Sequence, residues 1–373
     1  MKIGIIAKDS LDNKKLWSGT IYNLSKFVKQ SYEVVPIIIK DSLVKKCLLR
    51  GMKIVFRNKR TILTTILDKA VLSKEIKKAI EDGVNIFLGM AVSDLIASNG
   101  IPKECKLIYL SDATYHAMFN YYFFDNKHDQ KIGNQIEQRA INRADSIIYA
   151  SEWAKADAIN YYNAKKEKIT VMPFPSYIDD YYKKKSNLNM KTSIHLLFVG
   201  VEWERKGTDI AIDCVEYLNE IQNNILFDLT IIGLSKPKNK NYKSYIKFKG
   251  KLYKDNLEEY EELIRYYQNS DVFLLPTKAE CAGIVFSEAS MYGLPIFTHN
   301  TGGIGTYVKD GYNGMKLKLG SDGKDFGQAI LSMIQDKKLQ EYSDNSRNYY
   351  KENLSVEVWK KSFEEILTKI SKN

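Results

Sequence analysis

The stretch DVFLLPTKAECAGIVFSEASMYGLPIFTHN, residues 271–300, restricts the fold of this 373-residue chain more than any other feature. It opens with a short apolar run that Pro276 stops, which is typical of a buried strand. A helix of about three turns is predicted from Gly283, and Gly293 followed by Pro295 ends it. Residues 296–298 form the next predicted strand. This order predicts an open α/β sheet, which binds ligands outside the carboxyl ends of its strands.

Two carboxylates belong to this unit. Glu280 lies in the loop after the first strand, and Glu288 lies eight positions later, inside the helix. Amides at the helix start, residues 283–285, attract anions such as phosphate. Carboxylate oxygens accept hydrogen bonds from sugar hydroxyls. The stretch therefore predicts a sugar-phosphate site, although either glutamate could instead cap the helix or pair with a surface lysine.

The segment ECAGIVFSE, between LLPT and GLPIFTHNTGG, resembles the E-x7-E signature of retaining glycosyltransferases of the GT-B type, family 4 and its group 1 relatives. The resemblance implies that Glu280 holds the donor sugar and Glu288 the nucleotide ribose. It also implies that the backbone following Glu280 lines the sugar and the diphosphate, at Gly283, Ile284 and Val285. Ala282 stands where family members often carry Phe, which would alter the floor of the sugar pocket.

The N-terminal half opens with a predicted strand at residues 2–7, a loop containing Gly19 and Thr20, and a helix. A glycine at this junction lets an anion approach the backbone. The resemblance implies that Gly19 and Thr20 touch the donor diphosphate. Simple turn chemistry is the alternative explanation for the glycine.

Polar residues follow another predicted strand at residues 107–110. The resemblance places His or Asp at the end of this strand, close to the donor sugar and the acceptor. Asp112 matches that position best and is our candidate catalytic residue, with His116 as the second choice. Either could be structural, because an Asp after a strand often caps the next helix.

The second half repeats the pattern from a strand at residues 195–199. Arg205 and Lys206 lie between this strand and a helix, where two cations can bind an anion. The resemblance implies that they bind the donor diphosphate and stabilise it as it leaves. Val201 stands where many members carry a further Arg. As a bare pair, Arg-Lys is more often a solvated surface.

A glycine-containing turn follows the strand predicted at residues 246–248. Gly250 and Leu252 resemble the turn of the family that faces the nucleotide base. Because such contacts are mostly made by the backbone, the identity of the base is not readable from the sequence.

The resemblance implies an α/β GT-B fold, with two Rossmann-like domains facing across a donor-binding cleft. The composition changes at residues 173–193, which are rich in lysine. We therefore expect an acceptor-side domain at 1–180 and a nucleotide-sugar-binding domain at 190–354. An amphipathic helix at 355–370 is expected to pack back onto the first domain.

The segment 40–60 is basic and has apolar residues at helical spacing. This pattern is typical of a helix on a membrane surface, and it equally fits a solvated helix that packs through its apolar stripe. The cations of the segment, against the single acid Asp41, are Lys40, Lys45, Lys46, Arg50, Lys53, Arg57, Lys59 and Arg60.

The formal net charge is +11. Nucleic acid, an anionic membrane or an anionic small molecule could explain it, as could a general abundance of lysine. No apolar run reaches the roughly 18 residues that span a membrane, and the N-terminus does not resemble a signal peptide. The cysteines have no metal-type spacing. A cytoplasmic protein, with or without peripheral attachment to the inner membrane face, is expected.

We therefore predict an enzyme that transfers a sugar, with retention, from a nucleotide-sugar donor to a hydroxyl of a glycan, a glycolipid or another acceptor. Synthesis of cell-surface glycans, glycolipids or polysaccharides is the expected setting. No cofactor and no metal are expected, because the cations and helix amides neutralise the leaving diphosphate. The alternatives are a sugar-nucleotide epimerase of the same fold and a non-enzymatic basic protein that binds nucleic acid, the latter disfavoured by the glycine-bearing strand ends.

Overall fold

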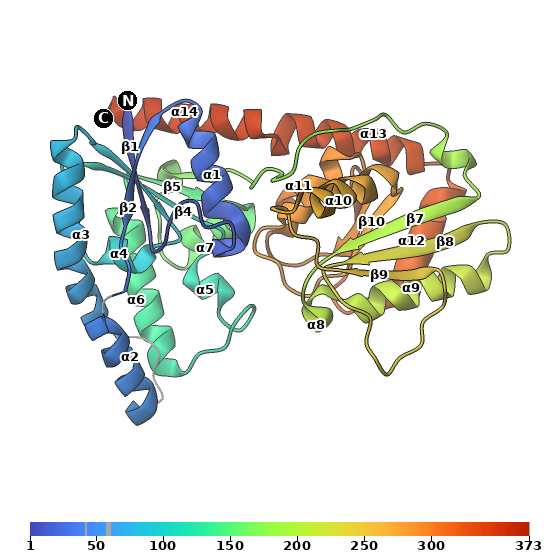
Figure 1. The fold of residues 1–373 in the computed structure, drawn as a ribbon, viewed down its shortest axis with the longest axis horizontal. Helices are drawn as coiled ribbons and strands as arrows, with labels where there is room; N and C mark the ends of the chain where they lie inside the picture. Colours follow the sequence, from blue (N-terminus) through green and yellow to red (C-terminus); the bar gives the residue numbers. More distant parts are fainter. Residues whose placement is uncertain (42, 57–60, 373) are drawn as a thin grey trace. The chain divides into compact units, whose positions relative to one another are not determined.

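The computed structural model describes residues 1–41, 43–56 and 61–372, and it contains two compact units, each built around its own sheet (Figure 1). The first unit comprises Met1–Met172 and Trp359–Asn373, and the second comprises Pro173–Val358. Each unit is described below by itself.

The sheet of the first unit is six-stranded, and its described pairs are parallel. Its strands are β1 (Lys2–Ala7), β2 (Glu33–Ile38), β3 (Ile86–Met90), β4 (Lys106–Ser111), β5 (Ser146–Tyr149) and β6 (Ile169–Val171). They are arranged in the order β2-β1-β3-β4-β5-β6. The inner strands are almost continuously apolar and buried, as expected for a parallel sheet covered on both faces.

Helices pack on both sides of this sheet (Figure 1). They are η1 (Leu16–Gly19), α1 (Thr20–Lys29), α2 (Leu43–Phe56), α3 (Leu63–Glu81), α4 (Ser93–Ala97), α5 (Tyr115–Met118), α6 (Lys127–Arg143), α7 (Glu152–Asn160) and η2 (Lys166–Lys168). Of the predicted basic segment 40–60, Arg57, Lys59 and Arg60 lie outside the described residues.

The C-terminal helix α14 (Val356–Ser371) contributes an aromatic face to the first unit. Trp359 packs against Phe27 of α1, with ring centroids 6.3 Å apart, and Phe363 meets Tyr32 edge-on at 6.3 Å. Lys360 Nζ donates a hydrogen bond to the side chain of Gln30 at 2.9 Å. These contacts explain why the last helix groups with the residues at the start of the chain.

The second unit also contains a six-stranded parallel sheet. Its strands are β7 (Ser193–Val199), β8 (Leu226–Ile232), β9 (Ile246–Gly250), β10 (Val272–Leu275), β11 (Ile296–His299) and β12 (Gly314–Leu317). The order is β12-β11-β10-β7-β8-β9, so β7 and β10 are neighbours in the middle. The loops after these two strands therefore meet at one edge, where the chain order reverses.

The helices of the second unit flank this sheet (Figure 1). They are η3 (Leu188–Met190), α8 (Trp203–Lys206), α9 (Thr208–Ile221), α10 (Leu257–Asn269), α11 (Ile284–Met291), η4 (Gly302–Thr306), α12 (Gly323–Gln335), α13 (Leu339–Tyr349) and the π-helical η5 (Tyr350–Leu354). The helix predicted from Gly283 is thus slightly shorter than expected, because Gly283 itself is the N-cap.

The segment 173–180 groups with the second unit. Phe174 donates its amide to Tyr307 Oη at 3.0 Å, and its carbonyl accepts the hydroxyl of Ser287 at 2.8 Å. The amide of Asp179 donates to Tyr260 Oη at 2.8 Å. These bonds fix the start of the lysine-rich stretch to the core of this unit.

Within the residues that the structure describes, no helix has the length and apolar character needed to cross a bilayer.

Candidate donor site

Gly207 brings the end of β7 and the end of β10 together. It joins α8 to α9 with φ at +71°, and a Cβ placed there would lie 2.2 Å from the carbonyl oxygen of Pro276. Only glycine tolerates both the left-handed backbone and this close approach. The pair Arg205–Lys206 is thereby held against the loop that follows β10.

Hydrogen bonds then join the two loops. The amide of Lys278 donates to the carbonyl of Arg205 at 2.7 Å, and Arg205 Nη1 donates to the carbonyl of Ala279 at 2.8 Å. The next residue in this loop is Glu280. Its carbonyl accepts the amide of Gly303 at 2.9 Å, which adds the loop after β11 to the same edge.

Glu280 forms an ion pair with Lys206. The ammonium of Lys206 donates to Oε2 of Glu280, and Nη1 of Arg205 lies 3.8 Å from the same oxygen. Glu280 and Lys206 are both buried. The structure therefore places three of the predicted site residues in one cluster, in which a carboxylate lies beside two cations.

Arg205 has a second acidic partner, Glu202, which we did not predict. Arg205 Nε donates to Glu202 Oε2 at 2.9 Å, and Nη2 donates to Oε1 at 2.6 Å. The bidentate bond to Arg205 lowers the pKa of Glu202 below its usual value. Such fork-to-fork pairs are the strong form of the arginine–carboxylate contact, so an anion arriving at Arg205 competes with Glu202.

Glu288 is held by two residues that sequence reasoning missed. It is 2% exposed. Lys254 Nζ donates to its Oε1 at 2.5 Å, and the hydroxyl of Tyr267 donates to its Oε2 at 2.8 Å. Burial raises the pKa of Tyr267 well above its usual value, with the charge of Glu288 adding to the effect. Both oxygens of Glu288 are therefore fixed in orientation.

Lys254 connects Glu288 with the predicted base-facing turn, since it follows Gly250 and Leu252 in the loop after β9. Gly250 has φ at +67°, its amide donates to the carbonyl of Leu234 at 3.1 Å, and its carbonyl accepts the amide of Gly233 at 2.6 Å. Any contact of Gly250 with a base would therefore use the remaining lone pair of its carbonyl. Leu252 is half-buried and packs on the core.

The start of α11, which follows the Glu280 loop, is also closely packed. A Cβ at Gly283 would lie 2.2 Å from the ring of Phe286, so a larger residue would displace that buried ring. Ala282, Ile284 and Val285 are half-buried beside it. The amide of Phe286 donates to the carbonyl of Gly283 at 2.8 Å. Helix geometry leaves the amides that precede it without an intrahelical acceptor, and they lie directly after the Glu280 loop.

The candidates in the first unit form a separate group. Gly19 is the left-handed N-cap of α1, and Thr20 is buried at its start. The preceding Trp17 also has a left-handed backbone, with φ at +50°, and its indole donates to Asp112 Oδ2 at 3.3 Å. The structure thus brings Asp112 together with the loop that holds Gly19.

His116 has a packed environment in the same unit. Its Nδ1 lies 2.7 Å from Asp157 Oδ1, and its ring stacks on Tyr161 with centroids 3.5 Å apart. Thr114 also hydrogen bonds to Asp157. These contacts give His116 a clear structural role, and the placement of Asp112 beside the Gly19 loop keeps Asp112 as the better candidate.

Across the described part of the chain, no group of three or more His, Cys, Asp or Glu side chains is arranged to hold a metal ion. The cations beside the two glutamates are Arg205 and Lys206, which were predicted, and Lys254, which was not.

Two parallel α/β units of this kind constitute the GT-B fold. A crystallised Anabaena protein, Alr3699/HepE in complex with UDP and glucose, shares it with a TM-score of 0.66 at 16% identity, over 99% of this chain and 100% of that one. The model of the glycosyl transferases group 1 family matches residues 180–352, which lie within the second unit.

Curated relatives agree with this family. A D-inositol 3-phosphate glycosyltransferase of Paenarthrobacter aurescens is 27% identical over 54% of this chain and 51% of its own length. The lipopolysaccharide glucosyltransferase WaaG of Escherichia coli is 25% identical over 52% of this chain and 54% of its own length. The chain thus spans about half the length of these relatives.

Proposed function

We propose that the chain is a glycosyltransferase that moves a sugar from a nucleotide-sugar donor to an acceptor hydroxyl, with retention at the anomeric carbon and without a metal ion. The observation that carries the proposal is the cluster of Glu280, Lys206 and Arg205 at the adjoining ends of β7 and β10. It combines a carboxylate for a sugar with cations for a diphosphate, immediately before the helix start at Gly283.

The two cations serve the leaving group. Negative charge grows on the diphosphate as the bond to the sugar breaks, and pre-positioned cations stabilise that charge most where water is excluded. Lys206 is buried and fixed by its bond to Glu280. Arg205 presents a planar fork, which suits phosphate oxygens once Glu202 yields its place.

Glu280 serves the sugar. Its carboxylate accepts hydrogen bonds from sugar hydroxyls, and its negative charge stabilises the positive charge that develops at the anomeric carbon. In the structure, Lys206 is paired with Glu280. A diphosphate that draws Lys206 toward itself would leave the charge of Glu280 less compensated, so that Glu280 interacts more strongly with the sugar. Asp112 is the candidate from the first unit for a contact with the acceptor hydroxyl.

Glu288 serves the nucleotide. Lys254 and Tyr267 hold both of its oxygens, which leaves each oxygen with a further lone pair for a ribose hydroxyl. A carboxylate already fixed in this way loses little freedom on binding. Ribose recognition at Glu288 and sugar recognition at Glu280 are then separated by the turns of α11 between them.

The proposed acceptor is a hydroxyl of a glycan, a glycolipid or another hydroxyl-bearing acceptor. The names of the relatives support this class, because one acts on D-inositol 3-phosphate and another on lipopolysaccharide. We further propose that the enzyme works in the synthesis of cell-surface glycans. UDP in the Anabaena complex supports a uridine nucleotide as the first donor to test.

A basic surface on α2 supports peripheral attachment to an anionic membrane. Leu43 is 79% exposed and Ile54 is 80% exposed, beside the exposed cations Lys46 and Arg50. The apolar stripe that a packed helix would bury is therefore largely on the surface. Lys45 differs from its neighbours: it is 3% exposed and bonds to Asp68 at 2.8 Å, so it holds α2 to α3 and takes no part in this surface.

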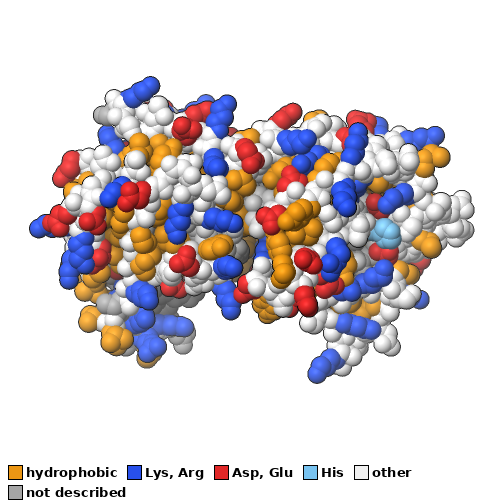
Figure 2. All heavy atoms as spheres, turned by 45° about the horizontal axis from the view of Figure 1, so that its top comes forward, with side chains coloured by type: hydrophobic (Ala, Val, Ile, Leu, Met, Phe, Trp, Pro, Cys, Tyr) orange, Lys and Arg blue, Asp and Glu red, His pale blue; other side chains and the backbone are white. Residues whose placement is uncertain are grey.

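The net charge of the chain is +11. On the face drawn in Figure 2, Lys and Arg side chains lie among Asp, Glu and hydrophobic side chains. This distribution favours a general abundance of lysine over a nucleic-acid-binding patch on that face.

Thermal-shift measurements with UDP-, GDP- and ADP-sugars test the proposal. A ligand that binds only the folded protein stabilises it by RT ln(1 + [L]/Kd) and so raises its melting temperature. We expect one nucleotide class to stabilise the protein, both as the sugar and as the free diphosphate. The absence of stabilisation by all three classes would contradict the proposal.

A further inference from the structure

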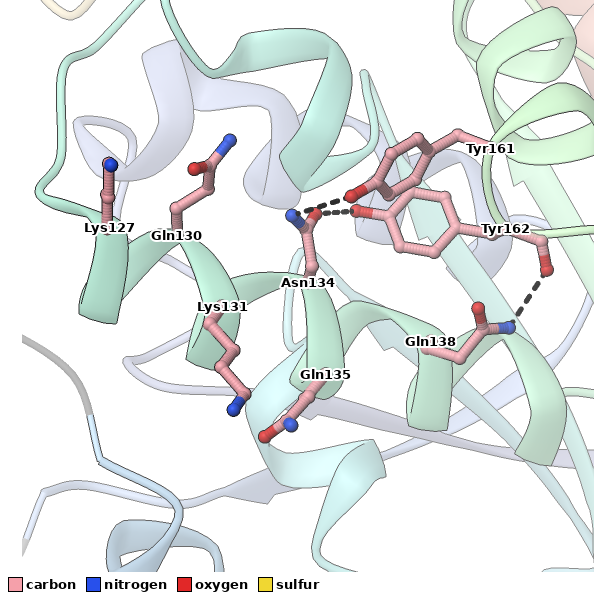
Figure 3. Close-up of a pocket in the computed structure, with 8 residues that line it drawn as sticks. All are labelled: Lys127, Gln130, Lys131, Asn134, Gln135, Gln138, Tyr161 and Tyr162. Carbon is pink, nitrogen blue, oxygen red and sulfur yellow. Dashed lines mark hydrogen bonds between the residues drawn. The ribbon is translucent and has the colours of Figure 1, made fainter.

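A pocket of about 550 Å³ lies in the first unit, between α6 and the two tyrosines that follow α7 (Figure 3). Its lining consists of lysine, asparagine, glutamine and tyrosine side chains. Among the described residues that line it, none carries a carboxylate and none is aliphatic. None of the candidate donor residues belongs to it.

The tyrosines of this pocket are held in place by Asn134. Tyr162 donates its hydroxyl to Asn134 Oδ1 at 2.5 Å, and Asn134 Nδ2 donates to the hydroxyl of Tyr161 at 3.2 Å (Figure 3). His116 stacks on one side of the Tyr161 ring, with an angle of 10° between the planes. Tyr161 is nevertheless 46% exposed. The ring is therefore a fixed aromatic surface that remains open to a ligand.

The polar side chains that α6 contributes to the pocket lie on both sides of the helix and differ in whether they have partners. Within the described part of the chain, the side chains of Lys127, Gln130, Lys131 and Gln135 make no hydrogen bond or ion pair. Gln130 points along the side of α6 that carries the tyrosines, whereas Lys131 and Gln135 extend along the other side (Figure 3). A ligand lying along α6 can reach both sides.

This combination specifies the chemistry of a ligand. A carboxamide offers both donors and acceptors, which matches a sugar hydroxyl that also does both. An exposed aromatic face packs on the C–H surface of a sugar ring and contributes apolar burial. Lys127 and Lys131 stand one turn apart and meet no acid in the lining, so they favour a carboxylate or a phosphate on the ligand.

We propose that this pocket binds an acidic saccharide, with Tyr161 under a sugar ring, the glutamines on its hydroxyls and the two lysines on its negative charge. The site is additional to the donor site and lies wholly on the first unit. The proposal stands on the lining of the pocket and does not depend on the transferase activity.

Titration calorimetry with trigalacturonate tests the proposal on the full-length protein, with neutral maltotriose as the matched probe. We expect trigalacturonate to bind at millimolar concentration or below and maltotriose to bind more weakly. The double variant Lys127→Gln/Lys131→Gln should weaken trigalacturonate binding by about tenfold, since exposed charge contacts contribute up to about 1 kcal/mol each. Added salt should weaken binding to the wild type in the same direction.

Matched variants separate this site from general effects. Lys74→Gln/Lys77→Gln removes two exposed charges from α3 and should leave the affinity unchanged. Tyr161→Phe keeps the ring and should retain most of the binding, whereas Tyr161→Ala should lose it. Melting temperatures measured alongside show whether Tyr161→Ala is folded, and UDP binding should be unchanged in the lysine double variant.

Two results would overturn the proposal. One is that the wild type does not bind trigalacturonate at millimolar concentration. The other is that Lys127→Gln/Lys131→Gln binds it as tightly as Lys74→Gln/Lys77→Gln does. A failure of UDP to bind would instead affect the proposed function and leave this site untouched.

Discussion

The ammonium of Lys206 and the carboxylate of Glu280 form a buried ion pair that joins the end of α8 to the loop after β10. The pair has two consequences. It fixes two strand ends against each other, and it keeps a cation and an anion together at the place where we propose that a sugar diphosphate binds. Removing both members of the pair should therefore affect the stability of the protein and its affinity for a nucleoside diphosphate differently.

Lys206→Met should destabilise the protein and abolish most UDP binding. Leaving one member of a buried pair alone costs about 3 kcal/mol or more. The double variant Lys206→Met/Glu280→Gln should recover much of that stability and still fail to bind UDP.

Arg205→Ala should weaken UDP binding by about 1.5–3 kcal/mol. Calorimetry with UDP and melting temperatures measure both quantities, and normal UDP affinity in Arg205→Ala and Lys206→Met would remove these residues from the site.

Glu202→Gln should tighten the binding of a nucleoside diphosphate. Glu202 occupies the guanidinium fork of Arg205, so neutralising it releases a donor for phosphate. Because the pair is partly exposed, a gain of severalfold, about 1 kcal/mol, is expected. Glu204→Gln is the control, since Glu204 is exposed on the same short helix. A gain of equal size in both variants would reflect net charge alone.

Lys254→Gln should raise the donor KM with little change in kcat. Lys254 holds Oε1 of Glu288, and the ribose contacts of Glu288 change little during the reaction, so their loss affects ground state and transition state alike. Lys251→Gln in the same loop is exposed and serves as the control. Steady-state kinetics with varied donor measure the effect, and a lower kcat with an unchanged KM would place Lys254 elsewhere in the mechanism.

Lys46→Gln/Arg50→Gln/Lys53→Gln should weaken binding to phosphatidylglycerol vesicles. Each cation near such a surface contributes about 1 kcal/mol. The affinity for the vesicles, measured by co-sedimentation, should therefore fall by about two orders of magnitude. Lys236→Gln/Lys238→Gln/Lys243→Gln removes equal charge from the second unit. Lys45 is left intact in both proteins, because it is bonded to Asp68. Equal sedimentation of the two variants would show that α2 is an ordinary solvated helix.

The elements around residues 271–300 could be predicted because local chemistry marks their ends. Pro276 stops β10, Gly293 ends α11, and Pro295 prevents the helix from resuming. The parallel α/β fold of the chain follows from this pattern and its repetition, and it is confirmed. Helices α3, α10, α12 and α13 and strand β12 were not predicted, although the capping box of Asp322 and Asp325 is a local signal for the start of α12.

The contacts of the candidate site were less readable, because they join residues that are distant in the sequence. Lys254 reaches Glu288 across 34 positions, and Lys206 reaches Glu280 across 74. The sequence suggested that Lys45 is a surface cation of a basic helix. In the structure it is buried and hydrogen bonded to Asp68, 23 positions later. A charge pattern alone does not tell which lysine turns inward. The spacing of three positions between Glu202, the N-cap of α8, and Arg205 within α8 was a local signal that could have been used.

We propose that Glu280 acts on the sugar and Glu288 on the ribose, and steady-state kinetics of Glu280→Gln and Glu288→Gln distinguish the two roles. Glu280→Gln should lower kcat strongly, because the charge of Glu280 stabilises the transition state more than the ground state. Glu288→Gln should mainly raise the donor KM. Melting temperatures of both variants show whether the folded protein is retained. A Glu280→Gln variant that keeps the wild-type kcat would contradict the account.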